Sequence, residues 1–327
     1  MKKSILKLAV FLAVFVLAFF IVGKIMNKDH DNLTMDLAPA SLPVVSMMLD
    51  GREYNHLHGY TQAVDVAFER DTVTILGESR DTDFVIDTYG REIQEVSIEV
   101  RSADGSRLIE NTVLSGLSRT GNIIQGTVAL KDLIEKDTDY SLCFVLQMDE
   151  GEKACYYTRV IWSEGLHVSE KLEYVTDFHE RLYDKEAAKE LTKYLETNSR
   201  LEDNSSFHKV NIHSSFKQIT WGDLPVQEIT APVVSLTELA SQTASFLMDY
   251  VVSTTEGKKT VYYLVEEHYR VRYTTDRMYL LDYERTMTQV PEAGQIYAND
   301  KLLLGITGTD IPMVESEDGN TVVFEVA

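Results

Sequence analysis

Two histidines one residue apart, His56 and His58, form the first group whose types and spacing could support chemistry. On an extended strand both rings would lie on one face, where Asp65 or Asp81 could complete a set of metal ligands. Imidazole and carboxylate groups suit zinc and related ions. The spacing is generic, and histidines in a polar segment are more often solvated, so we predict no metal ligand here.

Ser214 and Lys217 form a Ser-x-x-Lys pattern, the second group that could support chemistry. In penicillin-recognising enzymes the serine of this pattern is the nucleophile and the lysine helps to activate it. Those enzymes also require a Lys-Thr-Gly strand, whereas the counterpart here, 259–261, ends in valine. A four-residue pattern recurs by chance, and we therefore predict no catalytic serine.

A third group consists of Glu266, His268 and Arg270 on one predicted strand, with Asp282 and Glu284 on the next. Together they could line a polar groove. Cross-strand charge pairing on a solvated face explains them more simply. No zincin, nucleophile-elbow, Walker, dinucleotide-glycine or EF-hand pattern occurs in the sequence. We predict no catalytic, cofactor-binding or metal-ligating residue and no cofactor, and we favour a protein without catalysis of its own.

The charge of the chain is strongly asymmetric. The 327 residues carry 31 basic and 52 acidic side chains, a formal net charge of −21. The first 28 residues contain five lysines and no acid, which leaves 26 basic and 52 acidic side chains, a formal charge of −26, in the remainder. This field repels nucleic acid and anionic polymers, and it suits a soluble ectodomain, cation binding or a basic partner. Solubility alone is the simplest explanation.

An apolar stretch near the N-terminus predicts a membrane anchor. Residues 8–23 are uninterruptedly apolar, and residues 5–26 supply the roughly 20 helical residues that a bilayer core requires. Lys2, Lys3 and Lys7 precede the stretch, which predicts a cytoplasmic N-terminus and an extracellular bulk of the protein. A cleaved signal peptide is the alternative, but the exit lacks an Ala-x-Ala pattern and no lipid-accepting cysteine follows. We expect a single-pass protein of the cell membrane.

The rest of the chain divides into segments by its hydrophobic period, and the predicted class is mainly β with an α+β part. Residues 1–28 form the cytoplasmic tip and transmembrane helix, and residues 29–41 a polar stalk. Short alternating runs with turn signals over 42–165 predict an immunoglobulin- or fibronectin-like β-sandwich. Residues 166–292 predict an α+β domain, and residues 293–327 a short β segment.

One hairpin of the predicted sandwich contains the two cysteines, Cys143 and Cys155. A three-residue loop with glycine in the left-handed position fits 149–151, and it places Met148 opposite Glu152. Both cysteines then lie on one face along a diagonal. Diagonal Cβ atoms are about 7 Å apart, more than the roughly 4 Å of a disulfide. A β-bulge could shift the register, so a bridge and two semi-buried thiols both stay open.

The α+β region combines one helix with long strands. Asp184 can cap a helix over 185–197. The apolar residues of 172–182 fit either an earlier helix or an extended lead-in. Strands are expected at 245–252, 259–273 and 277–290, and such long strands should curl around the helix. Six residues of the second strand share one face: Val261, Tyr263, Val265, Tyr269, Val271 and Tyr273.

Several stretches resemble a family of single-pass, membrane-anchored extracytoplasmic proteins of Gram-positive bacteria that has no assigned activity. The resemblance lies in the anchor, in 41–45 and 57–60, in 184–191, and in 212–224, and it covers most of the ectodomain. It implies location and architecture but no catalytic residues. A looser likeness is to anchored regulators of cell-wall sensor kinases. Residues 317–324 resemble the opening of a β-propeller blade, which implies a chain truncated after Ala327.

The sequence therefore predicts a membrane-anchored extracytoplasmic protein with a binding, regulatory or scaffolding role. Its expected partners are the membrane, through residues 5–26, and a protein of the cell envelope, with no nucleic acid. Tyr262, Tyr263 and the stretch 279–283 are the expected contact region. The alternative is the anchor and accessory part of a larger cell-envelope hydrolase or substrate-binding protein.

Overall fold

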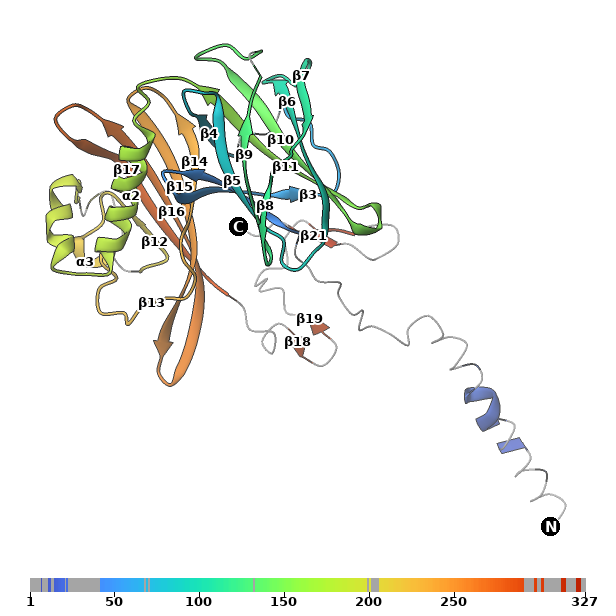
Figure 1. Cartoon of the computed structure of the whole chain (residues 1–327). Helices are drawn as coiled ribbons and strands as arrows, with labels where there is room; N and C mark the ends of the chain where they lie inside the picture. Colours follow the sequence, from blue (N-terminus) through green and yellow to red (C-terminus); the bar gives the residue numbers. More distant parts are fainter. Residues whose placement is uncertain are drawn as a thin grey trace. The chain divides into compact units, whose positions relative to one another are not determined.

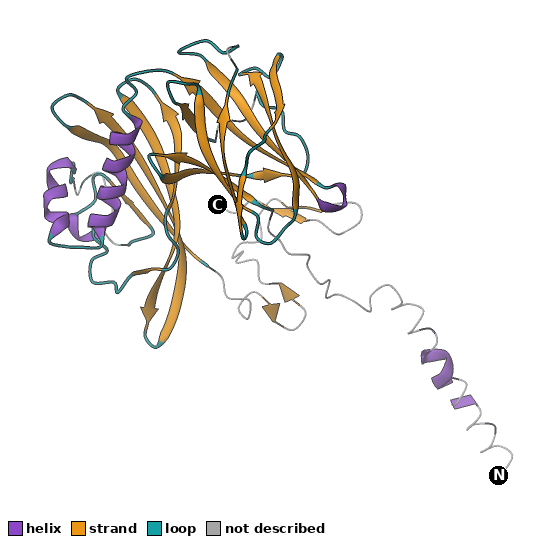
Figure 2. Cartoon of the chain, viewed as in Figure 1, coloured by secondary structure: helices purple, strands orange, loops and turns teal. Residues whose placement is uncertain are grey.

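Alternating apolar residues over 44–162 fold into two β-sheets that share one core. The computed structural model describes residues 42–290 except Phe68, Arg70, Asp132, Ser199 and 201–205, ten positions between residues 7 and 22, and four short strands after residue 290. Phe84 of one sheet and Phe144 of the other meet with ring centroids 5.0 Å apart. The fold is mainly β, as predicted, and this region is consistent with a β-sandwich (Figures 1 and 2).

The first sheet has five antiparallel strands and the second has six. The first has the order β2 (Arg52–Leu57), β1 (Val44–Leu49), β5 (Asp81–Asp87), β9 (Ile123–Ala129) and β8 (Ser118–Thr120). The second has the order β3 (Gly59–Tyr60), β11 (Lys153–Trp162), β10 (Asp139–Met148), β6 (Ile93–Ser102) and β7 (Leu108–Val113), with β4 (Val73–Leu76) parallel to β11.

The hairpin between β10 and β11 has the predicted register. The backbone N–H of Met148 donates to the carbonyl of Glu152 at 2.9 Å, and Gly151 adopts φ +81° in the turn Asp149–Gly151. Cys143 pairs with Tyr157 and Val145 with Cys155, so the cysteines lie on a diagonal and both are free thiols.

The second region is a long-stranded antiparallel sheet covered on its inner face by a helix. Its order is β12 (Lys209–Asn211), β17 (Met278–Gln289), β16 (Lys259–Tyr273), β15 (Thr243–Glu256) and β13 (Gln227–Glu228), with β14 (Val233–Leu239) also pairing with β15. The helix α2 (Val168–Leu182) packs its buried stripe on this sheet, where Phe178 meets the rings of Tyr269 and Tyr283 at 5.7 and 5.4 Å (Figure 1).

The helix predicted at 185–197 is corrected by the structure. Asp184 does cap the segment, since its carboxylate accepts from the N–H groups of Glu186 and Ala187, but the segment winds as the 3₁₀ helix Ala187–Tyr194. Its last turn closes by i to i+3 bonding, with the N–H of Leu195 donating to the carbonyl of Thr192. The 15-residue α2 covers the sheet instead, and the short α3 (Phe216–Ile219) follows.

Side chains of the sandwich join β14 of the second region, and Pro43–Ala327 form one compact unit. Asn55 is fully buried with φ +50° at an irregularity of the β1–β2 pairing. Its amide donates to the carbonyl of Val73 at 2.8 Å and to Thr74, and its oxygen accepts from the N–H of Leu236 at 2.7 Å. Arg159 donates to the carbonyl of Thr237 at 2.7 Å.

The two ends of the chain are described only at isolated positions. Among the described residues, no helix is both long enough and apolar enough to cross a bilayer. Most of the predicted anchor at 5–26, and all of the predicted stalk at 29–41, lie outside the described residues. After residue 290 the described strands are β18 (Tyr297–Ala298), β19 (Lys301–Leu302), β20 (Met313–Glu315) and β21 (Val322–Phe324); the propeller-like stretch 317–324 otherwise lies outside them.

Candidate functional site

The Ser-x-x-Lys residues are engaged with other partners. Ser214 is buried, and its hydroxyl accepts a hydrogen bond from the N–H of Asn211 at 2.9 Å. The ammonium of Lys217 pairs with the carboxylate of Asp223 at 2.5 Å on the surface. The serine is therefore a local structural residue of the turn before α3.

The His56–His58 pair lies at a pocket rather than in a metal site. His56 pairs with Glu53 at 3.5 Å, and burial lowers its pKa against the effect of that carboxylate. Asp65 lines a different pocket from the two histidines. Within the described part of the chain, no group of three or more histidine, cysteine, aspartate or glutamate residues could hold a metal ion.

The polar and aromatic residues that the sequence singled out on β16 and β17 lie on both faces of the sheet. On the outer face Arg270 lies opposite Asp282 and His268 opposite Glu284. This register fits cross-strand charge pairing. Of the expected contact residues, Tyr262 is 46 % exposed, whereas Tyr283 is fully buried and unavailable to a partner.

A polar pocket of about 410 Å³, called here the junction pocket, lies where the sandwich meets β14 and β15. His58 lies between β2 and β3, and Tyr60 belongs to β3. Tyr157 comes from β11, and the segment before β4 contributes two acids. Its full lining is His56, Leu57, His58, Tyr60, Glu69, Asp71, Thr72, Tyr157, Ser235, Thr237, Leu247 and Asp249. The pocket therefore gathers five separate stretches of the chain.

Asp249 is the most informative residue of the junction pocket. Its neighbours in β15, Met248 and Tyr250, are buried, so alternation turns Asp249 to the opposite face, towards the sandwich. Its carboxylate makes no hydrogen bond or ion pair with a described residue. Burial first, and then the nearby carboxylate of Glu266, raises the pKa of Asp249, while His58 opposes this shift. A carboxylate that has lost water without gaining a partner favours the arrival of a positive charge.

Aromatic and acidic groups also line the junction pocket. The rings of Tyr60 and Tyr157 lie 5.9 Å apart. Burial first, and then the carboxylates of Glu69 and Asp71, raises the pKa of Tyr60. The hydroxyl of Tyr157 accepts from the N–H of Val64 at 3.1 Å, which fixes the ring. Tyrosine faces and carboxylates together form the surroundings that organic cations prefer.

A second polar cluster lies under α2 and centres on Glu267, which the sequence analysis missed. Glu267 is fully buried and accepts hydrogen bonds from Tyr269 at 2.7 Å and Tyr283 at 3.0 Å. His179 bridges Glu267 at 2.8 Å and Glu228 at 3.1 Å. Alternation along β16 was the available signal, because it places Glu267 inward between Val265 and Tyr269.

The histidine and arginine of this cluster have structural partners. Burial alone would lower the pKa of His179, but Glu267 and then Glu228 raise it, so the ring is favoured as a cation between two carboxylates. Both ring nitrogens are occupied, which leaves no free base. Arg285 is fully buried, donates to the carbonyls of Ile219 and Gln218 at 2.9 Å each, and stacks 3.5 Å from the ring centroid of Trp221.

Comparison with known proteins gives no family for this chain: no protein-family model matches it, and no curated protein does. Function is therefore inferred from the geometry of the pockets and from the sequence.

Proposed function

We propose that the protein is a binding protein whose junction pocket takes an organic cation, either a small amine or a lysine-like side chain of a partner. The observation that carries the proposal is the carboxylate of Asp249, which is partly buried in the pocket and has no partner among the described residues. A bound ammonium group would supply the missing charge, and charge-assisted hydrogen bonds are the stronger kind.

The rest of the pocket supports the same ligand class. Glu69 and Asp71 add negative charge to the lining, and Tyr60 and Tyr157 add aromatic rings, which attract cations. A volume of about 410 Å³ falls within the range of roughly 300–1,000 Å³ typical of small-molecule pockets. The net charge of −21 attracts cations over longer distances.

The pocket favours binding over catalysis. The hydroxyl of Thr72 donates to Thr158 at 2.8 Å, and the hydroxyl of Thr237 donates to the carbonyl of Ser245 at 3.1 Å. These hydroxyls are held by the protein instead of being activated by a base. Nucleophilic catalysis needs a nucleophile hydrogen-bonded to a base that is itself oriented by a third group.

We further propose that the pocket is presented outside the cell by a membrane anchor at residues 5–26, in a regulatory or scaffolding role with an envelope partner. The supporting features are the apolar stretch 8–23, the lysines before it and the acidic charge of everything after it. A single-pass arrangement would place the ligand site in contact with the extracytoplasmic medium.

Isothermal titration of the full-length protein in non-ionic detergent tests the ligand class. Choline, spermidine and a lysine amide are compared with acetate and glutarate as anionic probes. We expect at least one cation to bind, no anion to bind, and Asp249→Asn to weaken cation binding by about tenfold or more, equivalent to about 1.4 kcal/mol. Asp282→Asn, an exposed acid on the outer face of β17, is the matched control and should leave binding unchanged.

Two results would contradict the proposal. One is binding of the anions with equal or greater affinity. The other is cation affinity that is the same in the Asp249→Asn variant as in the unsubstituted protein, since the carboxylate would then take no part.

A further inference from the structure

An apolar row crosses the outer face of the long-stranded sheet beside the junction pocket. Val251 of β15 is paired with Leu264 of β16. The N–H of Ile229 donates to the carbonyl of Val251, and the N–H of Val290 donates to the carbonyl of Tyr262, at 2.8 Å each. Side chains alternate along a strand, and paired residues of neighbouring strands share a face, so all five point away from α2. These five residues are called here the outer apolar patch.

The described residues leave the outer apolar patch largely uncovered. Four of its five members are between 41 and 51 % exposed: Ile229, Tyr262, Leu264 and Val290. Val265, which follows Leu264 but lies on the inner face, is fully buried. Adjacent exposed apolar side chains mark an interaction site, whereas single ones need no explanation.

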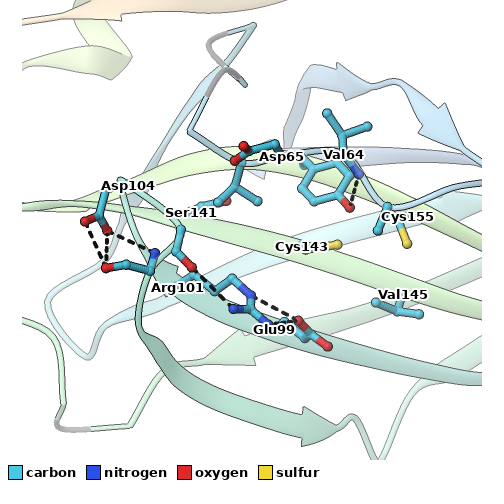
Figure 3. A pocket seen from close by; sticks show the side chains of 14 residues that line it. Val64, Asp65, Glu99, Arg101, Asp104, Ser141, Cys143, Val145 and Cys155 are labelled. Atoms are coloured by element: carbon cyan, nitrogen blue, oxygen red, sulfur yellow. Dashed lines mark hydrogen bonds and ion pairs between the residues drawn. The ribbon is translucent and has the colours of Figure 1, made fainter.

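The sandwich carries a comparable apolar face, and there a segment of the same chain covers it. Cys143 and Tyr157 are paired on the face of β10 and β11 that points away from the sandwich core. Val66 forms a buried apolar cluster with these two residues. Val64 packs against the cluster, and its N–H donates to the hydroxyl of Tyr157 at 3.1 Å (Figure 3). The fold thus already covers one outer face with its own chain.

The hairpin of β20 and β21 needs a surface on which to pack. Of its six strand residues only Glu315 is polar. Val314, which is paired with Val323, is 71 % exposed. An isolated two-stranded hairpin is at best marginally stable in water, and packing on another element is what stabilises it. A hairpin of this composition matches an apolar sheet face.

The chain connects the hairpin directly to the patch. Val290 is a member of the patch, and the 22 residues 291–312 separate it from Met313. A stretch of this length reaches at most about 70–80 Å, several times the width of four strands that lie about 4.8 Å apart. Two surfaces joined in one chain also meet at an effective concentration of up to about millimolar, which favours their contact over a partner from solution.

We propose that the hairpin of β20 and β21 packs on the outer apolar patch of its own chain and adds a further layer over β15 and β16. The contact removes exposed apolar side chains of both elements from water. Tyr262 is then an internal contact and not the binding surface for an envelope protein. The inference is independent of the ligand of the junction pocket.

Hydrogen–deuterium exchange of the full chain tests this contact, with the protein in lipid nanodiscs so that no detergent covers the patch. We expect the amides of β20 and β21 to exchange about tenfold or more slowly than in a synthetic peptide of residues 310–327. Leu264→Asp should remove this protection while β16 keeps its own. Leu281→Asp, at an exposed leucine of β17 outside the patch, is the matched control and should leave the protection unchanged.

A photo-crosslink tests the same contact without placing a charge in the patch, so it serves even if the aspartate variant fails to fold. With Tyr262→p-benzoylphenylalanine in the full chain, we expect irradiation to give links to residues 313–324 within one chain. Tyr89→p-benzoylphenylalanine, at an exposed position of the sandwich, is the control and should give no such link.

Four results would overturn the proposal. Exchange in β20 and β21 as fast as in the peptide would show that the hairpin is not packed. Equal protection in the Leu264→Asp variant would show that it packs elsewhere. Links from position 262 to a second copy, or protection that falls on dilution, would make the patch an interface between copies of the chain.

Discussion

Glu267 and Asp249 lie on neighbouring strands of one sheet, yet their surroundings are opposite. Glu267 faces α2, and although burial alone would raise its pKa, His179 and the nearby Arg285 lower it. Asp249 faces the sandwich, where burial and Glu266 raise its pKa. No described residue forms a hydrogen bond or ion pair with its carboxylate. The surroundings therefore lower the pKa of a carboxylate on one face of the sheet and raise it on the other.

Glu267 has a structural role, whereas Asp249 is the carboxylate that we propose binds a ligand. A buried acid with complete hydrogen bonding holds elements together, because its partners come from several of them. Glu267 joins β16 to α2 through His179 and to β17 through Tyr283. A partly desolvated acid without hydrogen-bond partners does not hold elements together. Its carboxylate oxygens can still accept hydrogen bonds from a ligand.

The largest expected effect on stability comes from removing the buried carboxylate of Glu267. Glu267→Ala should lower the free energy of unfolding by about 3–5 kcal/mol, because the buried Arg285 would lose a nearby counter-charge and the buried His179 would keep only Glu228. Urea denaturation followed by circular dichroism measures it. The neighbouring exposed Glu266→Ala is the control and should change stability by less than about 0.5 kcal/mol. Equal effects of the two substitutions would end the distinction between the two faces.

The pH dependence of stability should also come from the structural side. The folded pKa of His179 is raised above 6.5, so its contribution is fully present below about pH 6.5 and is lost as the pH rises through the folded pKa. The folded pKa of Glu267 is lowered below 4.5, so its contribution is present above about pH 4.5 and is lost as the pH falls through the folded pKa.

Denaturation from about pH 6 to about pH 9 should therefore show falling stability in the unsubstituted protein, and His179→Gln should flatten that decline. A decline of the same slope in the variant would mean that other groups cause it.

The smallest effect on stability is expected from substitution of Asp249. Asp249→Asn should leave the free energy of unfolding unchanged or raise it by less than about 1 kcal/mol at neutral pH, since it removes a carboxylate whose ionisation burial disfavours. The pKa of Asp249 is raised in the folded state, so this carboxyl group stabilises the folded state only at low pH, where it is protonated. The Asp249→Asn variant should therefore lack the increase in the free energy of unfolding that Asp249 gives at low pH. A marked loss of stability at neutral pH would show that Asp249 has a structural partner.

Local patterns predicted much of the fold. The predicted strand at 259–273 coincides with β16, and the hairpin register from Met148 to Glu152 is confirmed, because alternation and turn chemistry depend only on adjacent residues. The predicted helix at 185–197 is wrong, because that segment is the 3₁₀ helix Ala187–Tyr194. The segment 172–182, which the sequence left open as a helix or an extended lead-in, belongs to the long helix Val168–Leu182. Both segments carry an apolar stripe, and only packing on the sheet decides which one becomes the long helix.

The sites were less predictable, because their residues meet only in the folded chain. The residues predicted to share one face of β16 omitted Glu267, whose partner His179 belongs to another element and gives no local signal. The pair His56–His58 does line the junction pocket, but its relevant neighbour is Asp249, which no spacing in the sequence relates to it. The register did predict that the two cysteines share a face, and their different exposure came only from the structure.

The hydrogen bonds of Asn55 have a consequence for motion. The Asn55 side chain joins β2 to β4 by a hydrogen bond and also bonds the backbone of β14, 181 positions further along the chain. Arg159 adds a second hydrogen bond between the sandwich and β14. A hinge between the sandwich and the long-stranded sheet would have to break these buried bonds at once. The walls of the junction pocket should therefore move as one rigid body. A ligand would have to enter through an entrance that is always open and bind without domain closure.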